Sequence, residues 1–199
     1  MLIREDKLKT QNGEVFGWVI DGIVSEETCN KIIEHGKPSM KPSTTLDPYI
    51  PDYRTSSNTF AYYGNNKAVD EVAHLVCDFI QYPVENFEGM QIVHYNPGEY
   101  YKTHHDYFEK NTDHYESEIA RGGQRTWTAF LYLNDVSKGG ETNFPYVNFT
   151  VKPKRGTMIL WMNTNQNGEV IDDSLHEALS PKSGEKWGAN IWVREKKFR

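Results

Sequence analysis

A series of short apolar segments separated by turn residues fills the second half of this 199-residue chain and constrains its fold more than any other feature. The segments are rich in β-branched and aromatic residues, and stretches that favour turns, such as NPG and NDVSKGG, lie between them. No helical pattern interrupts the series, so we predict an antiparallel barrel or sandwich. The predicted strands are residues 90–95, 126–133, 149–153, 156–162 and 185–195.

Two helical patterns and one strand-like run precede this series. Residues 15–23 form the apolar run, and Ser25 then caps a helix that has acidic residues in its first turn and ends at Gly36. A second helix, over residues 66–81, has an apolar stripe at helical spacing. That stripe consists of Val69, Val72, Ala73, Val76 and either Phe79 or Ile80. We expect both helices to support the sheet.

The segment between the two helices is rich in Pro, Ser and Thr, which predicts a mobile loop over about residues 38–60. This loop leads into an expected strand at RTSS, residues 54–57. The chain is long enough for one core but short for two. We therefore predict a single domain over residues 1–199, in which about 1–85 supply the helices and the loop and about 86–199 supply the β core.

Charge and composition argue against several kinds of partner. The chain has 28 acidic and 22 basic residues, a net charge of -6, and no long block of Lys or Arg, so we expect no nucleic-acid partner. The N-terminal residues lack the apolar core of a signal peptide, and no apolar run reaches membrane-spanning length. We therefore expect a cytoplasmic protein with no membrane partner. Cys29 and Cys77 lie in separate helical patterns, which predicts two reduced core thiols instead of a disulfide framework or a thiolate zinc site.

The stretch YYKTHHDYF, residues 100–108, contains two adjacent histidines followed by an aspartate. In an extended segment successive side chains alternate between faces, so His104 and Asp106 point the same way and His105 points the opposite way. Two histidines and one carboxylate are a usual ligand set for non-haem Fe(II), because they leave three coordination positions open. The pattern predicts a metal site built on His104, Asp106 and a distant histidine.

The remaining histidines differ in their surroundings. His35 and His74 lie in helical patterns and His94 lies in a strand, where ordinary packing explains them. His114 and Glu116 repeat the two-residue spacing, but in a strongly charged loop that has no apolar neighbours to exclude water. We therefore set this pair aside, and His176 remains as the third metal ligand.

A lysine follows His176 in the sequence and indicates a cosubstrate. We expect a strand that ends near His176, turns through residues 180–184 and returns as an antiparallel strand. The returning strand carries Lys186, Gly188, Asn190 and Trp192 on one face. A lysine among apolar strand residues needs an anion to offset the cost of its burial. The anion that we expect is a dicarboxylate cosubstrate.

Several motifs follow one another in a recognisable order over about residues 15–195. They are RTSS, EGMQIVHY, Tyr95-x-x-Gly98-x-x-Tyr101-x-x-His104-x-Asp106, GGQRTWTAFLYLND, GGETNFP, RGTMILW, SLH, GEKW and IWVRE. In this order they resemble the prolyl 4-hydroxylase family of Fe(II)/2-oxoglutarate-dependent dioxygenases. A histidine and an aspartate two residues apart are weak evidence alone, but the ordered set is specific.

The resemblance implies a mainly β fold with supporting α, in which N-terminal helices pack against a double-stranded β-helix, or jelly-roll. It implies that His104, Asp106 and His176 bind Fe(II). Lys186 would pair with the far carboxylate of 2-oxoglutarate, and Tyr95 would hydrogen-bond the same carboxylate. Thr142 of GGET is either part of the cosubstrate pocket or a threonine that caps a turn.

The resemblance also implies a set of residues on the peptide side of the site. They are Arg54, Ser56, Glu88, Tyr101, Arg125 and Trp192. Two of them have structural alternatives, since Arg125 could be a surface arginine beside the GGQ turn and Trp192 could serve core packing. The polar loop between Phe108 and Gly122 departs from the family pattern, and Arg194 stands where some relatives place another substrate-side residue. These departures concern the identity of the substrate more than the chemistry.

The implied reaction is hydroxylation of a peptidyl proline at C4, in which 2-oxoglutarate and O2 are consumed and succinate and CO2 are released. The protein would bind a proline-containing peptide or protein, the loop over about residues 38–60 would close over the pocket, and ascorbate would bind and support activity. The sequence leaves open whether the protein is a monomer or a homodimer.

Other functions fit the sequence less well. A 2-oxoglutarate oxygenase that acts on a free amino acid or another small molecule is the main alternative, and the absence of a basic stripe argues against a nucleobase. A metal-binding barrel without catalysis would not need Lys186 and Tyr95. A zinc hydrolase can use two histidines and a carboxylate, but it would leave Lys186 unexplained and lack an obvious general base.

Overall fold

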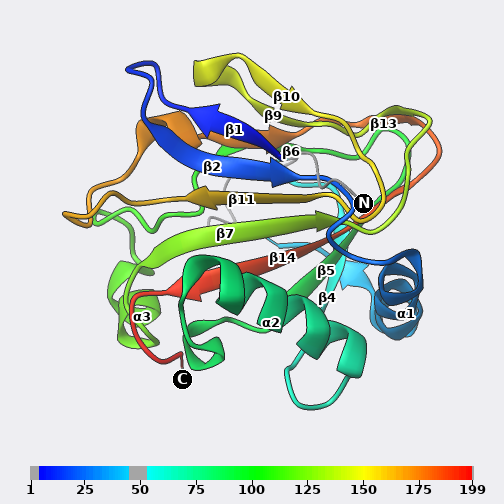
Figure 1. Ribbon diagram of the computed structural model, residues 1–199, viewed down its shortest axis with the longest axis horizontal. Coiled ribbons are helices and arrows are strands. Elements are labelled where there is room, and N and C mark those ends of the chain that lie inside the picture. The colour runs from blue at the N-terminus through cyan, green and yellow to red at the C-terminus, as the bar shows by residue number, and fades with distance from the viewer. Residues whose placement is uncertain (1–4, 45–52, 199) are drawn as a thin grey trace.

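Two antiparallel sheets form the framework of the protein (Figure 1). The computed structural model describes residues 5–44 and 53–198. The larger sheet contains, in spatial order, β1 (Glu5–Lys9), β2 (Val15–Ile20), β11 (Met158–Met162), β7 (Arg125–Tyr132), β14 (Lys186–Arg194), β5 (Met90–Tyr95), β4 (Ser57–Ala61) and β3 (Lys41–Pro42). The smaller sheet contains β10 (Phe149–Val151), β9 (Thr142–Phe144), β12 (His176–Ala178) and β6 (Tyr101–His104). A two-stranded sheet joins β13 (Pro181–Ser183) to β8 (Lys138–Gly139). Most neighbouring strands are not consecutive in the chain, which is the connectivity of a jelly-roll.

Both faces of the larger sheet are covered in its centre. On β7, Phe130 and Tyr132 pack toward the smaller sheet, together with Phe144 and Trp161. The alternate residues of the same strand, such as Leu131, pack in a second apolar cluster together with both long helices. Because a strand that is buried on both faces needs apolar side chains at successive positions, residues 129–132 of β7 and 191–193 of β14 are uninterrupted apolar runs.

Two helices cover the face of the larger sheet that points away from the smaller sheet. They are α1 (Glu26–Gly36) and α2 (Lys67–Ile80) (Figure 1). The Ser25 hydroxyl accepts a hydrogen bond from the Thr28 amide and so caps α1. The Asn66 side chain accepts from the first amides of α2, and the apolar stripe of α2 packs on the sheet as predicted. Ile80, and not the exposed Phe79, continues that stripe.

Short helical segments complete the described structure. They are α3 (Tyr115–Ala120) and the 3-10 turns η1 (Lys37–Ser39), η2 (Val84–Asn86), η3 (Pro145–Val147) and η4 (Asp172–Ser174). The helix α3 lies in the polar segment that was expected to be a loop, so this expectation was wrong. Its six residues place Glu118 beside the buried Arg194, and this ion pair stabilises a short helix within the charged segment.

The predicted strands are confirmed in the β core, but one predicted connection is wrong. The strand of His176 does not form a hairpin with the strand of Lys186, because β12 pairs with β6 and β9 whereas β14 pairs with β5 and β7. The intervening residues form β13, which pairs with β8 instead. His176 and Lys186 therefore approach each other across the space between two sheets.

The segment between the helices contains more structure than its composition predicts. It includes η1, β3 and the start of β4, and Arg54 forms an isolated bridge with Tyr101 before β4 begins at Ser57. The part of the predicted loop over residues 45–52 lies outside the described residues. The strand β1 was not predicted, because four of its five residues are charged and Leu8 is its one apolar residue.

The two cysteines agree with the prediction of reduced core thiols. Within the described residues both cysteines are free thiols, and burial raises the pKa of Cys29 to about 11. Cys77 is partly buried against the same core. No helix among the described residues is long and apolar enough to cross a membrane.

Candidate metal and cosubstrate site

The two sheets bring two histidines and one aspartate together. His104 ends β6 and pairs in register with His176 at the start of β12. The Nε2 atoms of these histidines lie 3.9 and 3.8 Å from the carboxylate oxygens of Asp106, and the three ligand atoms all lie within 4.8 Å of one another. In the part of the chain that the structure describes, this is the one such group of three. His105 points elsewhere, since its Nε2 lies 3.2 Å from the carbonyl oxygen of Asp172.

Both histidines are held in the orientation that a metal ligand needs. His104 Nδ1 donates to the carbonyl of Lys102 over 2.8 Å, and His176 Nδ1 donates to the carbonyl of Ser174 over 2.9 Å. These bonds fix the tautomer that leaves the Nε2 lone pairs facing Asp106. Burial lowers the pKa of His104 to about 3 and also lowers the pKa of His176, so both rings are neutral. Neutral imidazole is the form that binds a metal ion.

A hydrogen-bonded chain behind Asp106 fixes its carboxylate. The hydroxyl of Thr128 donates to Asp106 Oδ2 over 2.7 Å, and Asn163 Nδ2 donates to the same hydroxyl oxygen over 2.9 Å. Thr128 and Asn163 are fully buried. Neither residue was predicted from the sequence. Thr128 gave a signal, because it is a polar residue on the inward face of β7, in phase with the apolar rings of Phe130 and Tyr132.

The candidate cosubstrate pocket has Lys186 at its inner end. Lys186 is fully buried, and among the described residues its ammonium nitrogen has no hydrogen-bond partner. The rings of Tyr95, Phe130 and Tyr132 surround that nitrogen at 5.1, 5.0 and 5.3 Å. Burial lowers the pKa of Lys186 to about 7, and the charge of Glu141 opposes this only in part. A carboxylate bound here would supply the partner that the ammonium lacks.

Thr142 lines the same pocket as Lys186 and His176. It is the first residue of β9, and its hydroxyl lies 2.7 Å from the hydroxyl of Tyr132. The alternative role as a turn cap is therefore not what the structure shows. Tyr132 was not among the predicted residues, although it shares the inward face of β7 with Thr128.

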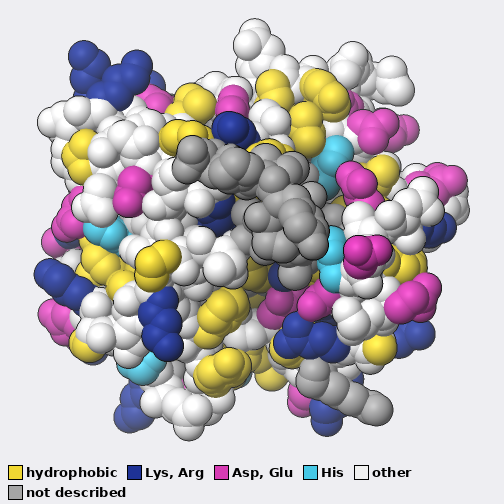
Figure 2. Space-filling model, turned by 180° about the vertical axis from the view of Figure 1, so that it is seen from behind, with side chains coloured by type: hydrophobic (Ala, Val, Ile, Leu, Met, Phe, Trp, Pro, Cys, Tyr) yellow, Lys and Arg dark blue, Asp and Glu magenta, His cyan; other side chains and the backbone are white. Residues whose placement is uncertain are grey.

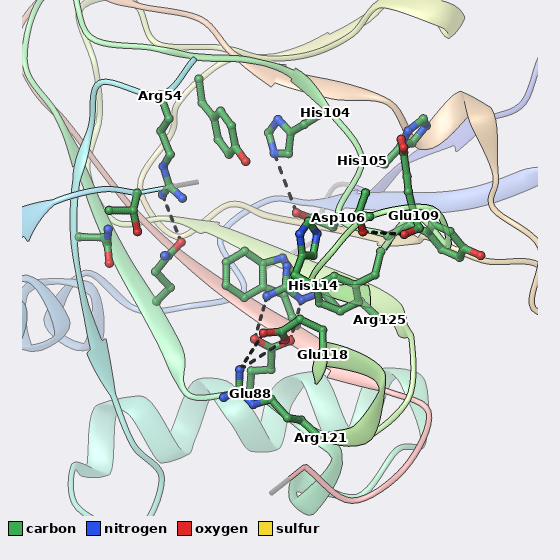
Figure 3. A pocket seen from close by; sticks show the side chains of 18 of the residues that line it. Arg54, Glu88, His104, His105, Asp106, Glu109, His114, Glu118, Arg121 and Arg125 are labelled. Atoms are coloured by element: carbon green, nitrogen blue, oxygen red, sulfur yellow. Dashed lines mark hydrogen bonds and ion pairs between the residues drawn. The ribbon is translucent and has the colours of Figure 1, made fainter. Parts of the chain in front are cut away.

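A larger groove of about 710 Å³ opens from the metal ligands to the surface (Figure 3). It meets the cosubstrate pocket at Tyr101, His104, Asp106 and Trp192, which line both. Tyr101 stacks on His104 with ring centroids 3.6 Å apart, and the guanidinium of Arg54 lies 4.8 Å from the Tyr101 ring. Rings and a delocalised cation therefore form one wall of the groove next to the metal ligands.

Five of the six predicted peptide-side residues line this groove. They are Arg54, Glu88, Tyr101, Arg125 and Trp192. Ser56 does not line it, because its side chain is only 2% exposed and its hydroxyl accepts from Arg54 Nε over 2.9 Å. Ser56 therefore orients Arg54. His114 also lines the groove, which contradicts the expectation that it lies in an open loop, but it does not join the metal ligands.

Two arginines, the buried Arg194 and the half-buried Arg125, hold Glu88 at the floor of the groove. Arg125 donates to both carboxylate oxygens over 2.6 and 2.8 Å, and Arg194 Nε donates over 2.6 Å. Burial alone would raise the pKa of Glu88, but the two guanidinium groups outweigh it and lower this pKa. The Arg125 guanidinium lies 3.8 Å from the ring centroid of Trp192, so Arg125 is not a surface residue and Trp192 faces the groove.

Arg194 connects this floor to the helix α3. Its guanidinium also donates to the side chain of Glu118 and to the carbonyls of Glu118 and Gly123. Sequence reasoning noted Arg194 but not this role, because the position of Glu118 depends on how the charged segment folds. The buried Arg194 thus holds both Glu88 at the floor of the groove and Glu118 of α3 at its wall.

The donor set and the pocket together define the class of the protein. Two imidazoles and one carboxylate on a jelly-roll are the ligand set of non-haem Fe(II) oxygenases. These donors suit Fe(II), and the unpartnered ammonium of Lys186 suits the far end of a dicarboxylate. Among the described residues this group of donors contains no thiolate, so it lacks the usual ligands of an iron–sulfur cluster.

Comparisons with known proteins agree with this class. The model of the 2OG-Fe(II) oxygenase superfamily matches residues 90–194. Prolyl 4-hydroxylase 5 of Arabidopsis thaliana is 32% identical over 215 residues, which cover 94% of this chain and 72% of that protein. The chain belongs to the prolyl 4-hydroxylase family of this superfamily, and the family implies Fe(II), 2-oxoglutarate and O2 as its cofactor and cosubstrates.

Solved structures show the same fold. The viral collagen prolyl hydroxylase of Paramecium Bursaria Chlorella virus-1, in its complex with 2OG, superposes with a TM-score of 0.74 at 29% identity. The match covers 90% of this chain and 96% of the viral chain. A prolyl-4-hydroxylase of Pseudomonas putida shares the fold with a TM-score of 0.62 at 19% identity, over 89% of this chain and 91% of that chain.

The two adjacent histidines should differ in their effect on metal binding. We expect His104→Ala to weaken Fe(II) binding by more than about 100-fold, because it removes a ligand atom that faces Asp106. His105→Ala is the matched control and should bind Fe(II) as the native protein does, since its ring bonds the Asp172 carbonyl. Anaerobic titration with Fe(II) measures both. Equal loss in the two variants would contradict the assignment.

Thr128 should act on the metal through Asp106. Thr128→Val keeps the shape of the side chain but removes the hydroxyl between Asp106 and Asn163, so we expect Fe(II) affinity to fall about 10- to 100-fold. Thr128→Ser retains the hydroxyl and should retain most of the affinity. The same titration measures both, and circular dichroism confirms folding. Unchanged affinity in the folded Val variant would show that the hydroxyl does not position the carboxylate.

Binding of 2-oxoglutarate should depend on the protonation of Lys186. The dicarboxylate binds the ammonium form, and the pKa of Lys186 is about 7 before it binds. The neutral amine must therefore take up a proton on binding above pH 7, and the dissociation constant should rise about tenfold per pH unit there. Titration of the Fe(II)-loaded protein without O2, between pH 7 and 9, measures this.

The control for this pH dependence is 2-oxopentanoate, which has the same carbon chain but lacks the far carboxylate. It should bind more weakly near pH 7 and show no such rise above it. In Lys186→Ala the two acids should bind with similar affinity, because the charge-assisted contact is lost. The same pH slope for both acids would place the titrating group elsewhere.

Proposed function

We propose that this protein hydroxylates a proline residue of a peptide or protein at C4, with His104, Asp106 and His176 as the ligands of Fe(II). In this reaction one oxygen atom of O2 enters the C–H bond of the proline, and the other enters succinate as 2-oxoglutarate loses CO2. Bound Fe(II) supplies the redox chemistry and the coordination positions for the 2-oxo acid and O2. The observation that carries the proposal is the buried, unpartnered ammonium of Lys186 beside these ligands.

The residues around the metal ligands have separate tasks in this proposal. Lys186 and Tyr95 hold the far carboxylate of 2-oxoglutarate, and Thr142 contributes to the wall of its pocket. The rings of Phe144 and Trp161 pack against His176, with centroids at 5.7 and 4.8 Å, and keep water from that side of the site. Exclusion of water protects a reactive oxidant from side reactions.

The size and the opening of the large groove are evidence for a polypeptide substrate. Its volume of about 710 Å³ exceeds what a free amino acid fills, and it reaches the surface beside Tyr101 and Trp192. The relatives named as prolyl 4-hydroxylases and collagen prolyl hydroxylase support proline as the residue that reacts. We further propose that ascorbate supports turnover as an external reductant of the iron. A free amino acid remains the alternative that the following experiment tests.

Mass spectrometry of peptide products should test the proposal. We expect proline-rich peptides to gain one oxygen atom only when Fe(II), 2-oxoglutarate and O2 are all present, and amino-acid analysis should find 4-hydroxyproline. Free proline, tested in parallel, should not be converted at a comparable rate. His105→Ala should form product and His104→Ala should not.

Two results would contradict the proposal. Conversion of free proline, or of another free amino acid, in place of every peptide would favour the small-molecule alternative. If the protein neither bound 2-oxoglutarate nor converted any substrate, a function as a 2-oxoglutarate-dependent enzyme would be excluded.

A further inference from the structure

Two exposed aromatic side chains lie in the groove away from the metal ligands. Phe60 and Tyr62 are 44% and 64% exposed, and both line the same groove as His104 and Asp106. Scattered exposed aromatics are normal on a protein surface, but two that share a groove with an active site call for a functional explanation. Figure 2, which shows the molecule from behind, has hydrophobic side chains exposed on that face beside charged ones.

The strand β4 places Phe60 on the face of the larger sheet that carries the site. Phe60 pairs in register with Gln91 of β5, and Gln91 pairs with Asn190 of β14. Asn190 lies two residues before Trp192 on the same face of β14. Two strand spacings therefore separate β4 from β14, which is roughly 10 Å. An extended peptide covers this distance in about three residues.

Gly89 makes the floor of the groove continuous between Tyr62 and Trp192. A Cβ atom at Gly89 would lie 3.0 Å from Cε1 of Tyr62, so the tyrosine ring rests where a side chain would otherwise stand. On the other side of Gly89, the amide of Glu88 donates to the carbonyl of Trp192 over 2.9 Å. Aromatic side chains thus line the groove from the metal ligands past Trp192 and Gly89 to Tyr62 and Phe60, and polar side chains such as Glu88 and Gln91 lie between them.

The polar groups of this floor already have partners within the protein. Glu88 is held by Arg125 and Arg194, and the Gln91 oxygen accepts from Arg54 over 3.2 Å. A basic side chain of a ligand would find no unpaired carboxylate among these residues, whereas the guanidinium of Arg54, beside the Tyr101 ring, has only the neutral partners Ser56 and Gln91. The floor therefore offers ring faces to an apolar residue, and a second proline or an aliphatic side chain fits this chemistry.

We propose that Phe60 and Tyr62 form a distal subsite that binds an apolar residue of the substrate polypeptide, about three or more residues away from the proline that reacts. This inference rests on the proposed function and deepens it. The subsite would make the enzyme prefer long substrates that carry apolar residues at a fixed distance from the target. Its occupant is the substrate chain itself, because the surface is continuous with the groove that leads to the metal ligands.

Peptides of two lengths test this subsite. The short peptide carries one proline with two residues on either side. Each long peptide adds six residues at one end, either N-terminal or C-terminal. These six residues either include prolines or consist only of glycine and serine. For the native protein, we expect kcat/KM to be about tenfold higher for one proline-containing extension than for the short peptide. The difference should lie in KM, and the glycine–serine extensions should not produce it.

Variants then assign the preference to the two rings. Phe60→Ala and Tyr62→Ala should each reduce the long-to-short ratio of kcat/KM about five- to tenfold. Tyr146→Ala removes another exposed tyrosine, 53% exposed and outside the groove, and is the matched control that should leave the ratio unchanged. Gly89→Ala should lower the ratio by displacing the Tyr62 ring, and it should have no further effect in the Tyr62→Ala background.

The outcomes separate this inference from the proposed function. If the native protein converts the short peptide but length, Phe60 and Tyr62 do not change the ratio, the distal subsite is wrong and the proposed function stands. If no peptide is converted, the proposed function fails. Fluorescence anisotropy of the same labelled peptides then decides the subsite alone, since equal binding by native and Tyr62→Ala protein would overturn it.

Discussion

The pairing of β6 with β12 is the constraint on which the candidate site depends. His104 and His176 stand opposite each other in this short antiparallel ladder, although most of the β core separates them in the sequence. Each strand is only three or four residues long, and β9 on the other side of β12 completes the smaller sheet. Antiparallel partners stand about 4.5–5.5 Å apart, so register alone brings both imidazoles within reach of one ion. A shift of one residue would turn one histidine to the opposite face.

The larger sheet supplies two further side chains of the candidate site, which the ladder of β6 and β12 does not provide. Thr128 of β7 orients Asp106, and Lys186 of β14 faces the ligands from across the core. The burial of Lys186 without a partner opposes folding, and apolar packing on both faces of β14 offsets that cost. At β14, the side chain that the proposed chemistry needs therefore lowers the stability of the fold. A carboxylate bound beside Lys186 would supply the partner that the ammonium lacks.

The sequence was sufficient for the features that depend on local pattern. Alternation around residues 100–108 predicted that His104 and Asp106 lie together and apart from His105, which is how they lie, although β6 ends at His104 and Asp106 belongs to the bend after it. Helical period and capping residues predicted both long helices. It was insufficient where the outcome depends on which strand is the neighbour. The false hairpin between His176 and Lys186 is one example, because a short loop between two strands indicates a hairpin equally well when the strands belong to different sheets. The role of Asn163 is another, since only the packed fold brings its amide to Thr128.

The charged residues of the groove limit what kind of substrate it can select. Glu88 is neutralised by Arg125 and Arg194, and Arg194 is shared with Glu118. Removal of one member of such a network leaves an uncompensated charge. The charges of these residues therefore maintain the shape of the groove and are not free to pair with a substrate. Among the described residues, the ring faces from Tyr101 to Trp192 remain open to a ligand, together with the guanidinium of Arg54, whose partners Ser56 and Gln91 are neutral.

A proline residue suits a surface of this kind. It has no backbone N–H, and therefore it loses no hydrogen bond to water at that position when it enters a groove whose acceptors are already occupied. Its ring presents an apolar face at low cost in conformational entropy, because the ring fixes the backbone angle φ in advance. A residue with a free amide would lose hydration there without a new partner. The preference of this groove for proline would thus have two causes. One is contact with the proline ring, and the other is that the polar side chains of the groove already bond one another and do not replace the hydrogen bonds that a backbone N–H loses.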